Sequence, residues 1–541
     1  MTLGEYLVKL LENYGVDTVF GIPGVHTVDM YRGLAHSNIQ HVTPRHEQGA
    51  GFMADGYARA CGKPGVALLI TGPGLTNALT AMGQAYADSV PMLVISAVNH
   101  IGKLGHGEGE LHESPNQGLM AAQVSAFSFQ VRTPADLPKA IARAFAVFEG
   151  GRPRPVHIEI PVDLFAADAA HLPTKRRSKI LPPRPARKAM QQAIELCRNA
   201  KSPVIFLGGG CRKNPALALK LAERLDAPTV MTINARGIIP AGHPLEISAS
   251  PSLNAIRNLA NNADLVLAFG TEMGRTDYNV FEREPFSTKV PLIRCDIDPL
   301  QLARNTPCDV ALVGDAAEAM QDLLDELPAA QNNGAARAAT ARKAALAEQP
   351  EKYQKLISIL QGIQETAPNA YIIGDSTQLP YAGNMYFPVK STARWFNSAC
   401  GFGALGYGLP AAIGAKTAVP DNPVICLVGD GGLQFSLAEL GTAMEVGGAF
   451  IVICWNNNGY GEIKSAMQAR NVAPVGVDLH TPDFVDLAKS YGMNACNATS
   501  LQTLTDALQN ALGSKTPTLI EITESEMLSN FQIAKKSPPE A

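Results

Sequence analysis

Residues 423–432 read PVICLVGDGG, and residues 450–461 read FIVICWNNNGYG. Each stretch begins as a short apolar run and ends in glycine next to a residue with a hard oxygen ligand, Asp430 or Asn457. Such runs are typical of buried parallel strands, and a glycine-rich turn after a strand lets backbone N–H groups approach a phosphate. Because the carboxyl ends of parallel strands share one edge of a sheet, the two stretches predict a phosphate site with a bound Mg²⁺.

Similar apolar runs recur along the chain and alternate with longer segments that suit crossover helices. They occupy residues 66–71, 92–97, 156–160, 203–208, 265–270, 371–374 and 518–522. Alternation of this kind is typical of α/β folds. The 541 residues exceed what one hydrophobic core can organise. We therefore predict an α/β fold with three consecutive doubly wound parallel-sheet domains.

Two stretches interrupt the alternation and predict linkers. Residues 171–190 (HLPTKRRSKILPPRPARKAM) are basic and proline-rich, and residues 329–350 (AAQNNGAARAATARKAALAEQP) are polar and alanine-rich. The basic residues of the first stretch also allow a polyanion site, although a solvated linker is the simpler interpretation. The predicted domains are 1–170, 190–328 and 350–530.

The composition argues against several classes of function. A formal net charge of −4 provides no large field to attract nucleic acid. The nine cysteines are odd in number and form no C-x-x-C pair, which indicates reduced thiols and not a zinc site. No stretch approaches the ~20 apolar residues of a membrane span. The opening stretch MTLGEYLVKLLENYG predicts a folded helix and not a signal peptide, because it carries Glu5 and Glu12. We expect a cytoplasmic protein that binds neither nucleic acid nor membranes.

The segment RHEQGA at residues 45–50 contains a candidate catalytic glutamate, Glu47. The residues after it, 49–53, are small or apolar, so this turn has no polar face and we expect Glu47 to be buried. Burial favours the protonated form of a carboxyl group, which can then share a proton with a ring nitrogen.

Together, Glu47, Asp430 and Asn457 make the chain similar to thiamine-diphosphate-dependent enzymes of the acetolactate synthase and pyruvate decarboxylase type. The resemblance implies that Glu47 activates the cofactor through its aminopyrimidine ring. It also implies that Asp430, Asn457 and the Gly459 carbonyl hold Mg²⁺ against the diphosphate. By position along the chain it assigns further cofactor contacts to Pro73, Asn77, Ser376, Thr377, Gly403, Leu405, Gly429, Gly431 and Gly432.

The same resemblance implies an order of domains and an assembly. The three domains would be pyrimidine-binding, central and diphosphate-binding, in that order along the chain. The protein would be a homodimer or homotetramer with active sites at the subunit interface. The substrate would be a small 2-oxo acid, and the cofactor would supply the carbon chemistry.

Overall the sequence resembles those of acetolactate synthase catalytic subunits, but three departures argue against acetolactate synthesis. Leu111-His112-Glu113 stands where those subunits have Phe-Gln-Glu, and Ala126 stands where they have a lysine. Their arginine-bearing central segment has no clear counterpart near residues 271–278. We therefore expect flavin to be absent or dispensable.

Four residues bear on the choice of substrate and on proton transfer. By resemblance, His26 and His112 match catalytic histidines of relatives. A lone histidine is usually structural, which is the alternative for both. The resemblance also implies that Val25 borders the substrate. Glu462 stands where pyruvate and benzoylformate decarboxylases have an apolar residue facing the substrate, and a carboxylate there suits a cationic substrate. The chain then resembles the 5-guanidino-2-oxopentanoate (2-oxoarginine) decarboxylases of bacterial arginine catabolism.

Two alternatives stay open at this point. Glu462 can instead turn away from the substrate and pair with Lys464 or Arg470. The enzyme can instead be an acetolactate-synthase-like or benzaldehyde-lyase-like carboligase, because the sequence does not fix whether the intermediate is protonated or attacks a second carbonyl.

Overall fold

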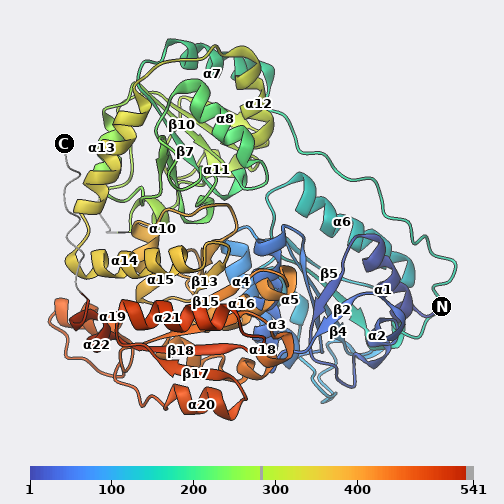
Figure 1. Cartoon of the computed structure of the whole chain (residues 1–541). Helices are drawn as coiled ribbons and strands as arrows, with labels where there is room; N and C mark the ends of the chain where they lie inside the picture. The colour runs from blue at the N-terminus through green and yellow to red at the C-terminus, as the bar shows by residue number, and fades with distance from the viewer. Residues whose placement is uncertain (281–283, 532–541) are drawn as a thin grey trace.

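The computed structural model describes residues 1–280 and 284–531 and contains three parallel six-stranded sheets (Figure 1). We call the parts of the chain built around them the first, middle and third units. The first sheet has the order β2 (Gln40–Val42), β1 (Thr18–Phe20), β3 (Gly65–Leu69), β4 (Met92–Val98), β6 (Val156–Pro161) and β5 (Phe127–Gln130). The middle sheet has the order β12 (Val310–Val313), β11 (Leu292–Asp296), β10 (Leu265–Phe269), β7 (Pro203–Leu207), β8 (Thr229–Met231) and β9 (Glu246–Ile247). The third sheet has the order β14 (Trp395–Asn397), β13 (Tyr371–Gly374), β15 (Val424–Gly429), β16 (Phe450–Asn456), β18 (Thr518–Thr523) and β17 (Asn494–Asn497).

The first and third sheets share one strand order. Numbered within its own unit, each sheet runs 2-1-3-4-6-5. The α/β fold with three parallel sheets is therefore confirmed, and each apolar run predicted to be a strand coincides with one of the longer strands. The strands that sequence analysis did not assign are mostly short strands near the sheet edges, such as β2 and β9.

Helices cover both faces of the sheets. Those of the first unit are α1 (Leu3–Asn13), α2 (Val28–Tyr31), α3 (Glu47–Cys61), α4 (Pro73–Ala87), α5 (Gln117–Ala122) and α6 (Leu137–Gly150). Those of the middle unit are α7 (Arg187–Asn199), α8 (Pro215–Leu225), α9 (Asn254–Asn261), α10 (Arg275–Tyr278), α11 (Pro299–Leu302), α12 (Ala316–Glu326) and α13 (Gly334–Ala347). Those of the third unit are α14 (Glu351–Thr366), α15 (Gln378–Met385), α16 (Gly408–Ala418), α17 (Asp430–Gln434), α18 (Leu440–Val446), α19 (Gly461–Ala469), α20 (Phe484–Ser490), α21 (Leu501–Leu512) and α22 (Glu524–Ser529).

One of the two predicted linkers is wrong. Residues 171–186 contain no helix or strand and run outside the body of the protein to the middle unit, as Figure 1 shows. The stretch 329–350, in contrast, is mostly the helix α13, which packs on α9 and β9. Alanine is the strongest helix former, and Ala338, Ala341 and Ala345 provide a buried stripe of small side chains. Low complexity in this stretch therefore reflects a tightly packed helix.

The first and third units meet through the crossing of α3 and α16, which lie together near the centre of Figure 1. A Cβ atom on Gly56 would lie 1.9 Å from the Ala411 carbonyl oxygen. A Cβ atom on Gly414 would likewise lie 1.9 Å from the Met53 carbonyl oxygen. The two helix backbones therefore touch, and no larger residue fits at either glycine.

A buried ion network beside this crossing connects all three units. Arg59 of α3 donates to Asp55 at 2.6 Å and to Asp88 at 2.7 Å. It also donates to the Asn234 side chain of the middle unit at 3.1 Å, while the Tyr407 hydroxyl of the third unit donates to Asp55 at 2.6 Å. Removing one member would leave a buried charge without its partner.

Two further expectations concern the cysteines and the membrane. All nine cysteines are free, and most are buried, as a set of reduced core thiols would be. Among the described residues, no helix has the length and apolar character that a membrane span requires. The opening helix predicted from the sequence is α1, which begins with a capping box between Thr2 and Glu5.

Candidate active site

Asp430 and Asn457 meet at the carboxyl edge of the third sheet, as their sequence pattern predicts. Asp430 follows β15, and Asn457 follows the adjacent strand β16. The Asp430 carboxylate accepts a hydrogen bond from the backbone N–H of Gly459 at 2.7 Å and a longer one from that of Asn457 at 3.5 Å. Burial raises the pKa of Asp430, and the two amides oppose this rise.

The side-chain amide of Asn457 lies beside the Asp430 carboxylate and the Gly459 carbonyl. In the orientation that satisfies its neighbours, the amide nitrogen donates to Asp430 Oδ1 at 3.3 Å and to the Gly459 carbonyl oxygen at 2.8 Å. In the opposite orientation the amide oxygen would join the carboxylate and the carbonyl, and oxygens of these three kinds are the ligands that a divalent cation prefers.

The turn is backed by residues 375–377, which connect β13 to α15. Asp375 is fully buried, and its carboxylate accepts from the backbone N–H of Ser376 at 2.7 Å and of Gly408 at 3.0 Å. Burial raises the pKa of Asp375 to about 6. The Ser376 hydroxyl lies 3.2 Å from that of Ser398. A Cβ atom on Gly429 would lie 2.8 Å from the Thr377 hydroxyl, so the strand end and the α15 N-terminus are in contact.

The other third-unit residues assigned to the cofactor lie on the same edge of the third sheet or just beyond it. Gly431 and Gly432 are buried. A Cβ atom on Gly431 would lie 2.8 Å from the Tyr460 ring, and a Cβ atom on Gly432 would lie 3.2 Å from the Asp375 side chain. Gly403 and Leu405 occupy the loop before α16, where Gly403 has φ +74° and is exposed. Leu405 is only half-buried in the single chain.

Glu47 is half-buried, so the expectation of a buried glutamate is wrong for the single chain. It is the first residue of α3, and the packed part of the helix begins only at Gly49. Its carboxylate accepts a hydrogen bond from the Asn77 side chain at 2.9 Å. The apolar residues after Glu47 are buried against α4 and α16 and leave its side chain at the open end of the helix.

His26 and His112, which are far apart in sequence, lie against each other. Their ring centroids are 5.2 Å apart, and the rings meet edge to face. The Nδ1 atoms of both are buried and have no hydrogen-bond partner. Burial and the neighbouring His112 lower the pKa of His26. His112 has φ +62°, and a Cβ atom on Gly72 would lie 2.3 Å from its carbonyl oxygen.

Glu462 makes neither of the ion pairs considered as its alternative. Lys464 binds Asp478 at 2.6 Å, whereas Glu462 accepts a hydrogen bond from Gln378 at 2.8 Å. The Glu462 carboxylate also adds to the raised pKa of Tyr381, which burial brings to about 12. Glu462 is exposed in the single chain, so its carboxylate is not buried without a partner.

The site residues form two groups. The contacts of Glu47, Asn77, His26 and His112 lie within the first unit. The contacts of Asp430, Asn457 and Glu462 lie within the third. Val25 and Pro73, assigned to substrate and cofactor, are exposed beside the first group. Within the described ranges, no cluster of three or more His, Cys, Asp and Glu side chains could hold a metal ion, so a cation site here depends on amide and carbonyl oxygens.

Sequence analysis missed three polar residues that support these groups. Gln117 accepts from the backbone N–H of Gly72 at 2.9 Å and donates to Ser96 at 3.1 Å. Gln378 binds Glu462, and Glu439 accepts from the backbone before Glu47. Nothing in the local sequence distinguishes Gln117, because it directly follows the mostly polar residues 113–116.

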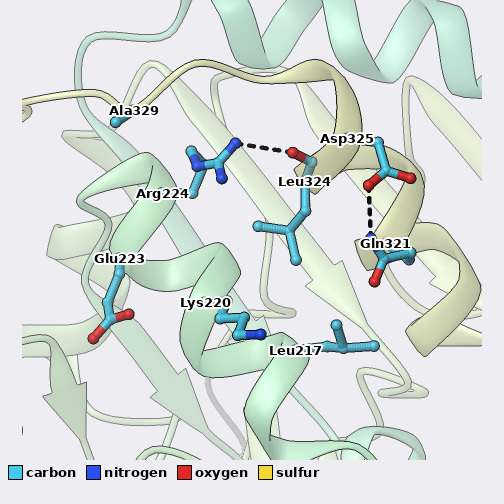
Figure 2. Close-up of a pocket in the computed structure, with 8 residues that line it drawn as sticks. All are labelled: Leu217, Lys220, Glu223, Arg224, Gln321, Leu324, Asp325 and Ala329. Carbon is cyan, nitrogen blue, oxygen red and sulfur yellow. Dashed lines mark hydrogen bonds between the residues drawn. The ribbon is translucent and has the colours of Figure 1, made fainter.

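Two surface hollows lie elsewhere on the protein. One of about 450 Å³ lies between α8 and α12 of the middle unit (Figure 2). In it, Arg224 donates to the Leu324 carbonyl at 2.9 Å and Gln321 donates to Asp325 at 2.7 Å. Some of its polar groups therefore already bind protein atoms. The other, of about 620 Å³, lies under residues 176–184.

Comparison with known proteins gives matches over most of the chain. Three domains described as those of a thiamine pyrophosphate enzyme match in order: the N-terminal TPP binding domain over residues 1–120, the central domain over 190–323 and the C-terminal TPP binding domain over 375–522. A probable 2-ketoarginine decarboxylase, AruI of Pseudomonas aeruginosa, is 45% identical over 96% of this chain and 94% of its own length. A probable acetolactate synthase large subunit of Methanococcus aeolicus is 30% identical over 96% of this chain and 92% of its own. The acetolactate synthase isozyme 1 large subunit of Escherichia coli is 30% identical over 96% and 93%.

Proposed function

The chain belongs to the thiamine pyrophosphate enzyme family, and on that premise we propose that it is a Mg²⁺-dependent decarboxylase of 5-guanidino-2-oxopentanoate. Its products would be 4-guanidinobutanal and CO₂. One observation carries the choice of substrate: the Glu462 carboxylate follows the Asp430 and Asn457 turn directly and is held there by Gln378. The 45% identity with a probable 2-ketoarginine decarboxylase supports the same choice.

The residues of the third unit fit a diphosphate bound through Mg²⁺. Asp430, Asn457 and the Gly459 carbonyl lie together, and their carboxylate, amide and carbonyl oxygens are of the kinds that Mg²⁺ binds once the Asn457 amide turns its oxygen toward the other two. Ser376 and Thr377 place hydroxyl groups on the same edge of the sheet. When bound, thiamine diphosphate supplies a carbon nucleophile and an electron sink for the pair that decarboxylation releases.

Glu47 would hold the proton that is shared with the aminopyrimidine ring of the cofactor. Its side chain is held by Asn77, which keeps the carboxylate at the first turn of α3. In the single chain Glu47 is half-open to solvent, so the proposed chemistry needs a further part of the assembly to close the site around it.

His26 and His112 would move the proton that the product carbon takes up. Two imidazoles at 5.2 Å between centroids disfavour a doubly charged pair, and His26 has a lowered pKa. The lowered pKa favours the neutral imidazole of His26, which can donate a proton from one ring nitrogen and accept one at the other.

Glu462 would bind the guanidinium group of the substrate. A guanidinium donates two parallel N–H groups, which match the two oxygens of a carboxylate. Gln378 holds one oxygen of Glu462, and Tyr353 and Tyr381 lie near enough for its charge to raise their pKa. A cation with hydrogen-bond donors suits this group, whereas an apolar side chain offers the carboxylate no donor.

We further infer that two copies of the chain form each active site and that the enzyme is a homodimer or homotetramer. Glu47 and Leu405 are half-open in the single chain, although the proposed chemistry needs a site closed to water. Large apolar side chains are exposed around both groups of site residues, including Val25, Leu119, Phe402, Phe435 and Ile463. A second copy would cover them.

We also infer that the enzyme works in the cytoplasm. Its nine free cysteines suit a compartment that keeps thiols reduced.

A screen of 2-oxo acids tests the proposed reaction. Purified protein with thiamine diphosphate and Mg²⁺ is given 5-guanidino-2-oxopentanoate, 2-oxohexanoate and pyruvate, and CO₂ and aldehyde are both measured. Equal amounts of CO₂ and 4-guanidinobutanal from the guanidino acid are expected. The 30% identity with acetolactate synthases favours carboligation as the second candidate. CO₂ without aldehyde, together with a condensed hydroxy-oxo acid, would establish that alternative.

A further inference from the structure

Glu439 connects the third unit to the backbone that leads into α3. It ends the 3₁₀ turn Leu437–Glu439 and lies at the N-cap of α18, and only 1% of the residue is exposed. Its Oε1 atom accepts from the backbone N–H of Arg45 at 2.9 Å and of His46 at 3.2 Å. Its Oε2 atom accepts from the Thr442 hydroxyl at 2.7 Å. A single carboxylate is thus bonded to the two residues that directly precede Glu47.

Gly49 leaves the space that this carboxylate occupies. A Cβ atom on Gly49 would lie 2.3 Å from Oε1 of Glu439. The carboxylate therefore lies against the first turn of α3, where the partial positive charge of a helix N-terminus stabilises an anion. Burial raises the pKa of Glu439, and the bonds from Thr442 and from the two amides favour its ionised form.

We propose that Glu439 is a positioning residue for Glu47. The proposal rests on the proposed role of Glu47 in activating the cofactor. The Glu47 side chain is held by one hydrogen bond, from Asn77, so its place also depends on where α3 begins. Glu439 fixes that start from the unit that carries Asp430. An error of about 1 Å in the position of a catalytic group can cost about 10²-fold in rate.

Three substitutions and one control separate positioning from general stability. Glu439→Ala removes both acceptors, whereas Glu439→Gln keeps an oxygen for the two amides and leaves the Thr442 hydroxyl free to accept from the new amide. Gly49→Ala displaces the carboxylate without removing it. Glu445→Gln is the matched control, because the Glu445 carboxylate pairs with the Arg45 side chain, at 2.5 Å, in the same region.

Two readouts are measured on each variant of the full-length protein. The first is hydrogen exchange of the backbone amides of Arg45 and His46 without cofactor. The second is the pair of kcat and the calorimetric Kd for thiamine diphosphate with Mg²⁺. Glu439→Ala and Gly49→Ala should speed exchange at least about tenfold and lower kcat about 10- to 100-fold. Their cofactor Kd should stay within about threefold, because Asp430 and Asn457 are unchanged.

Glu439→Gln and Glu445→Gln should behave like the wild type in both readouts. The proposal is overturned if kcat and cofactor affinity fall together in Glu439→Ala, because Glu439 would then support the diphosphate turn. Wild-type kcat in Gly49→Ala, with faster exchange at Arg45, would overturn it as well. Glu47→Gln is measured alongside: wild-type turnover in that variant would contradict the proposed function itself, and not only the role of Glu439.

Discussion

The side-chain amide of Asn77 donates a hydrogen bond of 2.9 Å to the carboxylate of Glu47. Glu47 is the first residue of α3 and Asn77 is the fifth residue of α4, and these helices pack on each other. The bond holds the candidate catalytic group at the open end of the first unit. It also makes Glu47→Gln a conservative change, because the glutamine oxygen can still accept from Asn77.

We expect Glu47→Gln to abolish most of the turnover while the cofactor still binds. The substitution removes the acidic proton but keeps shape and hydrogen bonding, and proton transfer of this kind contributes about 10²- to 10⁴-fold. Turnover and calorimetric cofactor affinity are measured together. Wild-type turnover would show that Glu47 does not activate the cofactor.

Chelation of divalent cations should release thiamine diphosphate, and added Mg²⁺ should restore binding. Asp430 supplies the one carboxylate among the three groups proposed to bind the cation, so Asp430→Ala should weaken cofactor binding about 10²-fold or more. Calorimetric titration with and without Mg²⁺ measures both effects. Unchanged affinity in Asp430→Ala would rule out the proposed metal site.

Substrate choice should depend on Glu462. The wild type should prefer 5-guanidino-2-oxopentanoate to 2-oxohexanoate by about 10²-fold or more in kcat/KM, because the neutral side chain offers the carboxylate neither a positive charge nor N–H donors. Glu462→Gln should reduce that ratio by at least about tenfold. Asp478→Asn is the control. Asp478 pairs with Lys464, which lies on the same helix as Glu462, so this substitution should leave the ratio unchanged. If Glu462→Gln preserves the ratio, another residue selects the substrate.

Acid should destabilise the first unit through His157. This fully buried histidine of β6 lies 2.8 Å from the Ser96 hydroxyl and 2.7 Å from that of Ser128, and burial lowers its pKa to about 3. The unfolded chain binds a proton near pH 6.5, whereas the native state does not, so stability falls by about 1.4 kcal/mol per unit as pH decreases from there toward 3.

Thermal midpoints between about pH 4 and pH 8 check this effect. His157→Asn should flatten the decline in the acid range. Ser128→Ala is the control: it removes one hydrogen bond but keeps the imidazole, so it should lower the midpoint at every pH without changing the slope. An equally steep decline in His157→Asn would show that other groups cause the acid sensitivity.

The sequence was sufficient for those parts of the structure that depend on local pattern. The sequences of β15 and β16 are largely apolar. Asp430 follows the end of β15 directly, and Asn457 follows the end of β16 directly. Their meeting follows from parallel pairing alone. The exposure of Glu47 was not predictable in the same way, because it depends on where the packed part of α3 begins.

Contacts between distant segments were beyond local pattern. Glu439 bonds to a segment 394 residues away, and Gln378 to Glu462 across 84 residues. Glutamate and glutamine are ordinary surface residues, so nothing nearby in the sequence distinguishes these two. The linker prediction for the alanine-rich stretch of α13 was wrong for a different reason. The local composition of this stretch is compatible with both a linker and a packed helix.

The contact of α3 with α16 limits how this chain can exchange parts with its relatives. Gly56 and Gly414 each press on the backbone of the opposite helix, so each helix is shaped to its partner. A hybrid that joins the first unit of one relative to the third unit of another inherits two unmatched surfaces. Recombination, natural or engineered, should therefore preserve α3 and α16 as a pair and place its crossovers in the middle unit or in residues 171–186.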